Sequence, residues 1–112
     1  MIRQERTNAE LQKQLAIILS DGIKDPRVQG CMVSILRVEC DSDLTLARIF
    51  VSIYGADDRE KEVIEGLNSA QGYIKSCLKN KIKLRALPQL KFIYDDSIVY
   101  SMKIEKIIKD LH

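Results

Sequence analysis

The chain of 112 residues has little of what most enzymes and metal proteins need. It contains no tryptophan, three cysteines and a single histidine, His112. No two cysteines form a CxxC pair, so we expect no zinc site or other metal site. With one histidine, a Ser-His-Asp triad is not expected either. Cys31, Cys40 and Cys77 lie in apolar sequence surroundings, which predicts reduced and buried thiols.

Other signatures of catalysis and of membrane insertion are also missing. The sequence has no Walker-type loop and no GxGxxG motif. Its close aspartate pairs, 41 with 43 and 95 with 96, stand where turns and helix caps favour aspartate. No apolar run approaches the ~20 residues that span a bilayer, and the charged start is unlike a secretory signal. We therefore expect a cytoplasmic protein that is not an enzyme and uses no cofactor.

Acidic residues are missing from one long segment. The whole chain is nearly balanced, with 18 basic and 16 acidic residues, yet residues 66–94 contain six basic residues and no acidic one. The six are Lys75, Lys79, Lys81, Lys83, Arg85 and Lys91. Positive charge collected in one segment gives a local positive field, for which nucleic acid is the commonest polyanion. A solvated lysine-rich face is the alternative interpretation.

The first half of the chain reads as a helix followed by a hairpin. Apolar residues recur at helical spacing from Leu11 to Ile23, which predicts a helix that begins near Thr7 or a few residues earlier. Asp25-Pro26 brings that helix to an end. Period-two alternation then predicts strands over 32–40 and 44–54, and the three polar residues between them favour an antiparallel hairpin.

The second half reads as an interrupted helix, a strand and a last helix. Three of the residues 57–60 are acidic, which suits a helix N-terminus. Glycine and small polar residues at 68–72 interrupt the helical pattern, which resumes with Tyr73 and Ile74 and continues to Ile82. Residues 89–94 predict a third strand, and a final helix follows after 95–97. The order α-β-β-α-kink-α-β-α predicts one α+β domain with a three-stranded sheet packed by helices.

The kink is the candidate binding site. Asn68, Ser69, Gln71 and Gly72 precede a helix N-terminus, whose free amides and positive dipole end suit a phosphate group. Lys75, Lys79 and Lys83 follow at intervals of four, on one helical face. Lys81, Arg85 and Lys91 extend the positive surface. Five further basic residues join it only if the first helix packs nearby: Arg3, Arg6, Lys13, Lys24 and Arg27.

Aromatic residues are few, and Phe50 and Phe92 are expected in the core. This scarcity argues against recognition by base stacking and favours reading of nucleic-acid shape and phosphates. An alternative from another class remains open: a protein–protein interaction module whose exposed strand edge or last helix joins another chain.

The order of elements and the kinked helix pair resemble a type II KH-like domain, and the details resemble the ribosome-binding factor A family. The resemblance lies in residues 24–28, in Asp43-Leu44 with Ala47, and in Val51-Ser52. It continues in residues 67–74, in Leu84-Arg85 with Pro88, and in Leu90, Phe92 and residues 94–97. It covers about residues 3–111, in collinear order.

The resemblance implies a fold, a partner and a site. The Gly-x-x-Gly loop of ordinary KH domains is replaced in this family by Ala-x-Gly, which matches Ala70-Gln71-Gly72. The family is implied to bind the small (30S) ribosomal subunit and its 16S rRNA during late maturation and 5′-end processing, with a role in cold adaptation. We accordingly expect residues 1–112 to form a single KH-like RNA-binding domain, monomeric off the ribosome and not bound to a membrane.

Overall fold

The computed structural model describes residues 2–82 and 86–97, with side chains from residue 4 onward. Helix α1 (Ile2–Asp21) leads through a 3-10 turn, η1 (Pro26–Val28), into strands β1 (Met32–Cys40) and β2 (Leu46–Tyr54). Helices α2 (Glu60–Ser69) and α3 (Gln71–Lys79) follow, and strand β3 (Gln89–Tyr94) is the last of the described elements. The predicted α+β class and the predicted order are confirmed over the described residues. The expected last helix lies outside them.

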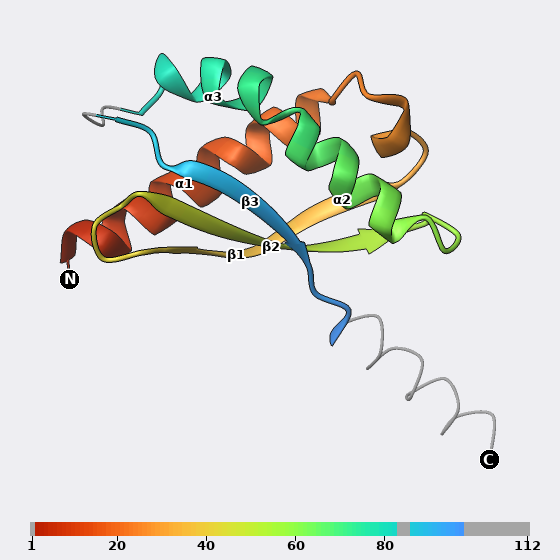
Figure 1. Ribbon diagram of the computed structural model, residues 1–112, viewed down its shortest axis with the longest axis horizontal. Helices are drawn as coiled ribbons and strands as arrows, with labels where there is room; N and C mark the ends of the chain where they lie inside the picture. Colours follow the sequence, from red (N-terminus) through yellow and green to blue (C-terminus); the bar gives the residue numbers. More distant parts are fainter. Residues whose placement is uncertain (1, 83–85, 98–112) are drawn as a thin grey trace.

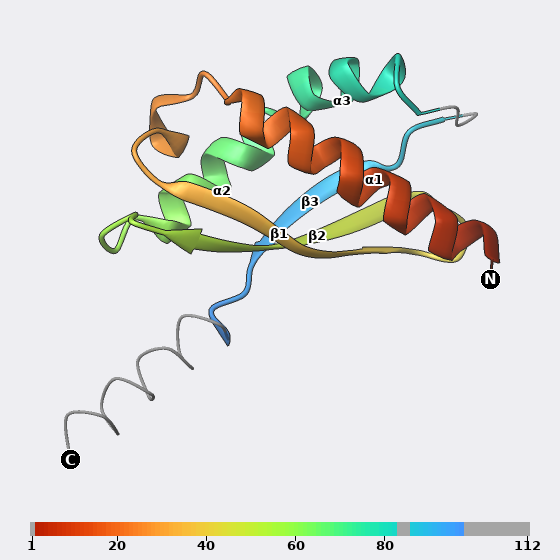
Figure 2. The same cartoon turned by 180° about the vertical axis from the view of Figure 1, so that it is seen from behind.

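The sheet is mixed and has the order β1-β2-β3. Strands β1 and β2 pair antiparallel, as the hairpin prediction required, while β3 pairs parallel to β2. Helices α1, α2 and α3 all lie on one side of the sheet (Figures 1 and 2), and no described element covers its other side. We call that other side the open face.

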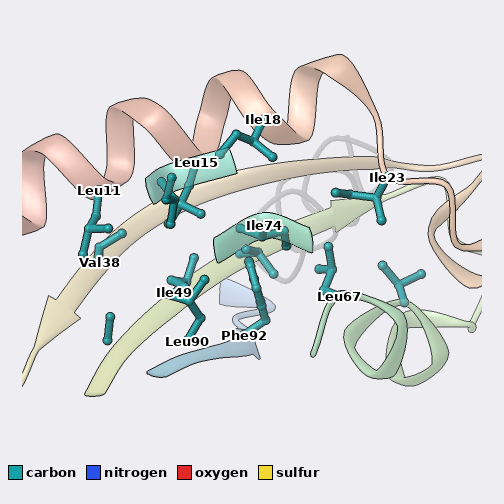
Figure 3. Packing of buried hydrophobic residues seen from close by; sticks show 14 of the residues in the cluster. Leu11, Leu15, Ile18, Ile23, Val38, Ile49, Leu67, Ile74, Leu90 and Phe92 are labelled. Atoms are coloured by element: carbon teal, nitrogen blue, oxygen red, sulfur yellow. The ribbon is translucent and has the colours of Figure 1, made fainter. Parts of the chain in front are cut away.

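One hydrophobic core lies between the sheet and the three helices (Figure 3). Alternate residues of β2 point into it, so Ala47, Ile49, Val51 and Ile53 are buried. Every helix contributes: the buried side chains include Leu11, Leu15, Ile18, Val63, Leu67, Ile74 and Leu78. Phe92 is buried as predicted, whereas Phe50 is only half-buried because it points to the open face. The core therefore fixes which side of each strand the helices cover.

A bulge in β1 changes the face on which its apolar residues lie. Ile35 pairs with Val51 and Arg37 pairs with Phe50, which leaves Leu36 without a partner across the strand. Val33 and Ile35 pack against the core before this point, and Val38 and Cys40 are buried after it. An extra residue in one strand shifts the alternation by one position. Both ends of β1 thus turn apolar side chains toward the helices.

The amide side chains of helices cap both outer edges of the sheet. On β1, the Asn8 side chain accepts a hydrogen bond from Cys40 N at 2.9 Å, and the Gln4 side chain donates to Cys40 O. On β3, Asn68 and Gln71 play the same part. Unpaired strand edges can template aggregation, so these contacts protect the sheet as well as position the helices.

Helix α1 takes the earlier of its two predicted starts, and the predicted start of β2 was wrong. Helix α1 begins at Ile2, so the polar sequence from Thr7 lies inside the helix; residues 3–6 contain only good helix formers. Strand β2 begins at Leu46 instead of Leu44, because Leu44 adopts a positive φ of 60° in the turn. The described part of the chain contains no helix long and apolar enough to cross a membrane.

Candidate nucleic-acid interface

Helices α2 and α3 are separated by a single residue, Ala70. Its N–H contacts both Gly66 O at 3.0 Å and Leu67 O at 3.1 Å, which ends α2. Its carbonyl accepts from Ile74 N at 3.0 Å, which begins α3. The backbone at Ala70 has φ −85° and ψ 3°, so the helical path breaks and turns there. The predicted kink is confirmed, and it is a one-residue interruption.

Two of the predicted site residues hold this joint against the sheet. Phe92 N donates to Asn68 Oδ1 at 2.9 Å, and Asn68 Nδ2 lies 3.4 Å from Phe92 O. Gln71 Oε1 lies 3.4 Å from Leu90 N, and Gln71 Nε2 donates to Asn68 O. These side chains therefore satisfy the outer edge of β3. Sequence reasoning missed this role because nothing in the sequence places residues 68–71 beside residues 90–92.

Two other residues of the kink face outward. Ser69 and Gly72 are exposed, whereas Ala70 is half-buried and packs against the core. Gly72 has no positive φ and lies in the first turn of α3. A Cβ atom built on Gly72 would meet no atom within 4 Å, so the backbone is open to a close-approaching ligand at this point. Such an approach suits a phosphate group at the helix N-terminus.

A basic flank of α3 adjoins Gly72. At 100° per residue, Gly72, Lys75 and Lys79 lie on the same side of the helix. Lys79 is exposed and Lys75 is half-buried, while Ile74 and Leu78 point to the core. We call Gly72, Lys75 and Lys79 the basic flank. Helix α3 lies at the outer edge of the helical layer (Figures 1 and 2), and Gly72 and Lys79 of this flank are exposed to solvent.

The other predicted basic residues are spread more widely. Lys81 is exposed just after α3 and extends the basic flank; Lys83 and Arg85 lie outside the described residues. Lys91 alternates with buried Leu90 and Phe92 and therefore lies on the open face, apart from the α3 lysines. Arg6 and Lys13 are exposed one heptad apart on α1, and Lys24 is exposed after it. The side chain of Arg3 is outside the described residues.

Ion pairing distinguishes the lysines from the arginines. Four ion pairs occur among the described residues, and each of them uses an arginine: Arg27 with Asp25, Arg37 with Glu39 and with Asp95, and Arg48 with Asp41. No lysine of the described chain takes part in an ion pair. The charge of the basic flank is therefore not neutralised by neighbouring carboxylates, so it is available to an external anion.

The open face has a different character. Arg37 lies over the ring of Phe50 with its guanidinium carbon 3.9 Å from the ring centroid. Both arginines of this face are paired with carboxylates, and its apolar side chains Leu46, Phe50 and Ile93 are half-buried. Apolar groups beside neutralised charges suit a protein contact better than a polyanion.

The groups that could support catalysis are engaged in structure. Asp43 accepts hydrogen bonds from the hydroxyl and backbone N–H of Thr45, and Asp95 accepts one from Ser97 N–H; these bonds lower the pKa of both carboxyls. Carboxylates held ionised in this way are poor general acids. Burial raises the pKa of the Cys31 and Cys40 thiols, which makes them weak nucleophiles at neutral pH.

The predicted free thiols are confirmed for the three cysteines, although only Cys40 is fully buried. No group of three or more histidine, cysteine, aspartate or glutamate residues within the described ranges could hold a metal ion.

The geometry defines a KH-like α+β domain in which the Ala-x-Gly sequence separates α2 from α3. Beside it lie lysines that form no ion pair among the described residues. Comparison with known proteins identifies the family. A sequence model of the ribosome-binding factor A family matches residues 3–108, and the chain belongs to this family. Ribosome-binding factor A of Caldanaerobacter subterraneus subsp. tengcongensis is 42% identical over 110 residues, which cover 98% of this chain and 89% of the relative. That of Brevibacillus brevis is 40% identical over 109 residues, which cover 97% and 88%.

Solved structures share the fold. A putative ribosome binding factor A of Thermotoga maritima, solved by NMR, matches with a TM-score of 0.72 and 30% identity and covers 85% of this chain and 89% of that one. The crystal structure of ribosome-binding factor A from Thermus thermophilus matches with a TM-score of 0.71 and 21% identity, over 81% and 93%. A homology model of the Thermus thermophilus factor, fitted into a cryo-EM map of a 30S complex, matches with a TM-score of 0.64 and 20% identity, over 80% and 91%.

Proposed function

We propose that residues 1–112 form one KH-like RNA-binding domain that binds the small ribosomal subunit through its 16S rRNA during late maturation, in the cytoplasm. Membership of the ribosome-binding factor A family is the observation that carries this proposal. A family of ribosome-binding factors also agrees with the prediction that the chain is not an enzyme. The domain acts by docking on an immature subunit and leaving when the subunit matures.

The basic flank is the part of the surface that we assign to RNA. Its lysines are unpaired among the described residues, and a phosphate backbone is a regular array of negative charge that releases counterions when it meets such lysines. At one end of the flank, Ser69 and Gly72 are exposed and leave the backbone accessible to a phosphate group. At the other end, Lys81 extends the flank. Lys83 and Arg85 follow Lys81 in the sequence but lie outside the described residues, so their contact with RNA stays a prediction from the sequence.

The other predicted contacts receive different parts in this proposal. Asn68 and Gln71 position the joint against β3, and their contribution to RNA binding is through the placement of α3. Arg6, Lys13 and Lys24 form a secondary surface, because they are exposed on α1 and just after it. Arg27 is committed to Asp25, and Lys91 lies on the open face, so we assign neither of them to the main contact.

Charge reversal of the flank tests the proposal. The triple variant Lys75→Glu, Lys79→Glu and Lys83→Glu is expected to lose co-sedimentation with 30S particles while its circular dichroism spectrum is unchanged. A matched pair of single variants sharpens the result: Lys79→Glu should weaken binding, and Lys61→Glu should not, although both change one exposed helical lysine. Full co-sedimentation by the triple variant would remove the flank from the binding surface.

The open face supports a second candidate, a protein–protein interaction module. No described element covers this face, and its arginines are neutralised by carboxylates. Salt separates the two candidates, because phosphate contacts weaken steeply as salt rises, whereas an apolar contact hardly changes. Affinity for 30S particles that is flat between about 50 and 200 mM salt would favour the protein contact.

A further inference from the structure

Tyr73 is an aromatic residue on the outer surface of α3. The sequence pattern placed it with Ile74 on the apolar side of the helix, but its side chain is 56% exposed, so that prediction was wrong. Ile74 and Leu78 fill the core beneath α3, and Tyr73 lies about 100° around the helix from Ile74. Of the aromatic side chains that the structure describes, only Tyr54 is comparably exposed, at 70%.

The surroundings of Tyr73 leave its ring accessible and uncharged. The Cys77 side chain, one helical turn further on, raises the pKa of the Tyr73 phenol, and Asp21 at the end of α1 adds a smaller effect in the same direction. The exposed ring is therefore uncharged at physiological pH.

The outward side of α3 divides into two flanks. The basic flank lies on one side, Tyr73 lies on the other, and Ser76 lies between Gly72 and Tyr73. The Ser76 hydroxyl donates to Tyr73 O at 2.7 Å, so this side chain bends back onto its own helix. The nearby carboxylate of Asp21 disfavours a phosphate on the tyrosine flank.

We propose that Tyr73 is a stacking platform for one unpaired base of the bound RNA, whose phosphates lie along the basic flank. This inference rests on the proposed function and deepens it, because it specifies single-stranded RNA as the ligand of the α3 surface. An aromatic ring stacks on any of the bases, whereas a base inside a duplex has no free face to offer. The sequence expectation of recognition without stacking is thereby replaced for this residue.

Binding of short RNAs tests the proposal directly. The probes are a fluorescein-labelled single-stranded oligouridylate and a duplex of the same length, measured by fluorescence anisotropy. We expect Tyr73→Ala to weaken binding of the single strand by about ten-fold, with an unchanged salt dependence because no phosphate contact is lost. Tyr73→Phe should bind like the parent chain, since it keeps the ring. Tyr54→Ala, at the other exposed tyrosine, is the matched control and should have no effect.

A fluorescence reporter gives a second readout. The chain has no tryptophan, so Tyr73→Trp and Tyr54→Trp each introduce a unique fluorophore. Emission of the residue at position 73 should be quenched by the oligouridylate, and emission at position 54 should not. If the RNA packs against α3 without stacking on residue 73, the emission at that position would not be quenched. That result would overturn the proposal.

The variants also separate failure of this inference from failure of the proposed function. If Tyr73→Ala binds the single strand like the parent while Lys79→Ala binds it more weakly, stacking is overturned and the phosphate contacts stand. If Tyr73→Ala weakens binding to 30S particles but not to the oligouridylate, Tyr73 contacts a ribosomal protein and the proposal is overturned. A parent chain that binds 30S particles but not the oligouridylate would overturn the stacking proposal alone, and a parent chain that binds neither of them would overturn both proposals.

Discussion

Helices α2 and α3 are two parts of one interrupted helix and differ in charge and in the elements that they contact. They are of similar length, 10 and 9 residues, but α2 carries three glutamates and one lysine, whereas α3 carries two lysines and no acidic residue. Gly66 in α2 is buried against η1, and Gly72 in α3 faces open space. Helix α2 contacts η1 and β3, whereas α3 contacts α1. The interruption separates a helix that builds the domain from a helix that presents a surface.

The joint between the two helices explains how this division is kept. A single continuous helix would carry α3 along the axis of α2 and away from α1. Ala70 ends one helix and begins the next, and Asn68 ties this turn to the backbone of Phe92. The position of the basic flank is therefore set by contacts on its buried side. Three of the following substitutions act on the packed side, and the last acts on the presented side.

The largest expected loss of stability comes from Asn68→Ala. It removes the acceptor of Phe92 N–H, and a partly buried backbone donor left without a partner costs about 2 kcal/mol. We expect the melting temperature to fall by roughly 10 °C and RNA affinity to fall with it, because α3 loses its position. Ser69→Ala, at the neighbouring exposed residue, should change the melting temperature little. An Asn68→Ala variant as stable as the parent would show that the joint does not depend on β3.

Gly66→Ala is expected to cost somewhat less. A Cβ atom there would lie 2.8 Å from Val28 Cγ2 and 3.1 Å from Arg27 Cβ, so η1 must move away from α2. Overpacking of this kind costs about 1–3 kcal/mol, and the gain in helix propensity returns about 1 kcal/mol of it. Thermal denaturation should show a net loss, in contrast to a gain at Gly72. If alanine raised the melting temperature at both glycines, η1 would be able to move away from α2 at little cost, and the two would not be tightly packed.

The sequence predicted the elements better than it predicted the contacts between them. Periodicity located the kink and the three strands closely because burial on one face imposes it residue by residue. It failed at Tyr73, where four of the six residues from 73 to 78 are apolar or aromatic and more than one helical face can be core. It also gave no sign that Lys91 lies apart from Lys79, since the face covered by the helices is a property of the assembled layers. Asn68 looked like a ligand contact because its partner is 24 residues away.

The η1 turn, which packs against α2, should become less stable in acid. Asp25 accepts hydrogen bonds from the Arg27 side chain, at 2.7 and 3.0 Å, and from Arg27 N at 2.9 Å; these bonds lower its pKa from 3.8 to about 2. Because the folded pKa is below the unfolded value, this stabilisation is present above pH 3.8 and is lost as pH falls through about 2. Asp25→Asn should therefore melt below the parent at neutral pH.

The pH dependence of the difference is the test at Asp25. The gap in melting temperature between the parent and Asp25→Asn should be constant from pH 7 to about 5 and should close between about 4 and 2. The pair is partly exposed, so the gap is expected to be small. Asp43→Asn is the comparison, because its carboxylate also has a lowered pKa but lies in the β1–β2 turn, away from α2. If the difference in melting temperature persists at pH 2, it arises from the shape of the side chain and not from its charge.

Gly72→Ala should have the smallest effect on stability. It also distinguishes most clearly between a role of the joint in RNA binding and a role in packing alone. Gly72 is helical and a Cβ atom there meets nothing within 4 Å, so alanine should raise stability by about 0.5–1 kcal/mol and the melting temperature by a few degrees. The same methyl group would stand where an RNA phosphate approaches the first amides of α3, and we expect 30S binding to loosen several-fold. Ser76→Ala is the matched control, because it favours the helix but removes volume, and it should leave binding unchanged. If Gly72→Ala binds as tightly as the parent, the joint serves packing alone, and recognition must come from the lysines.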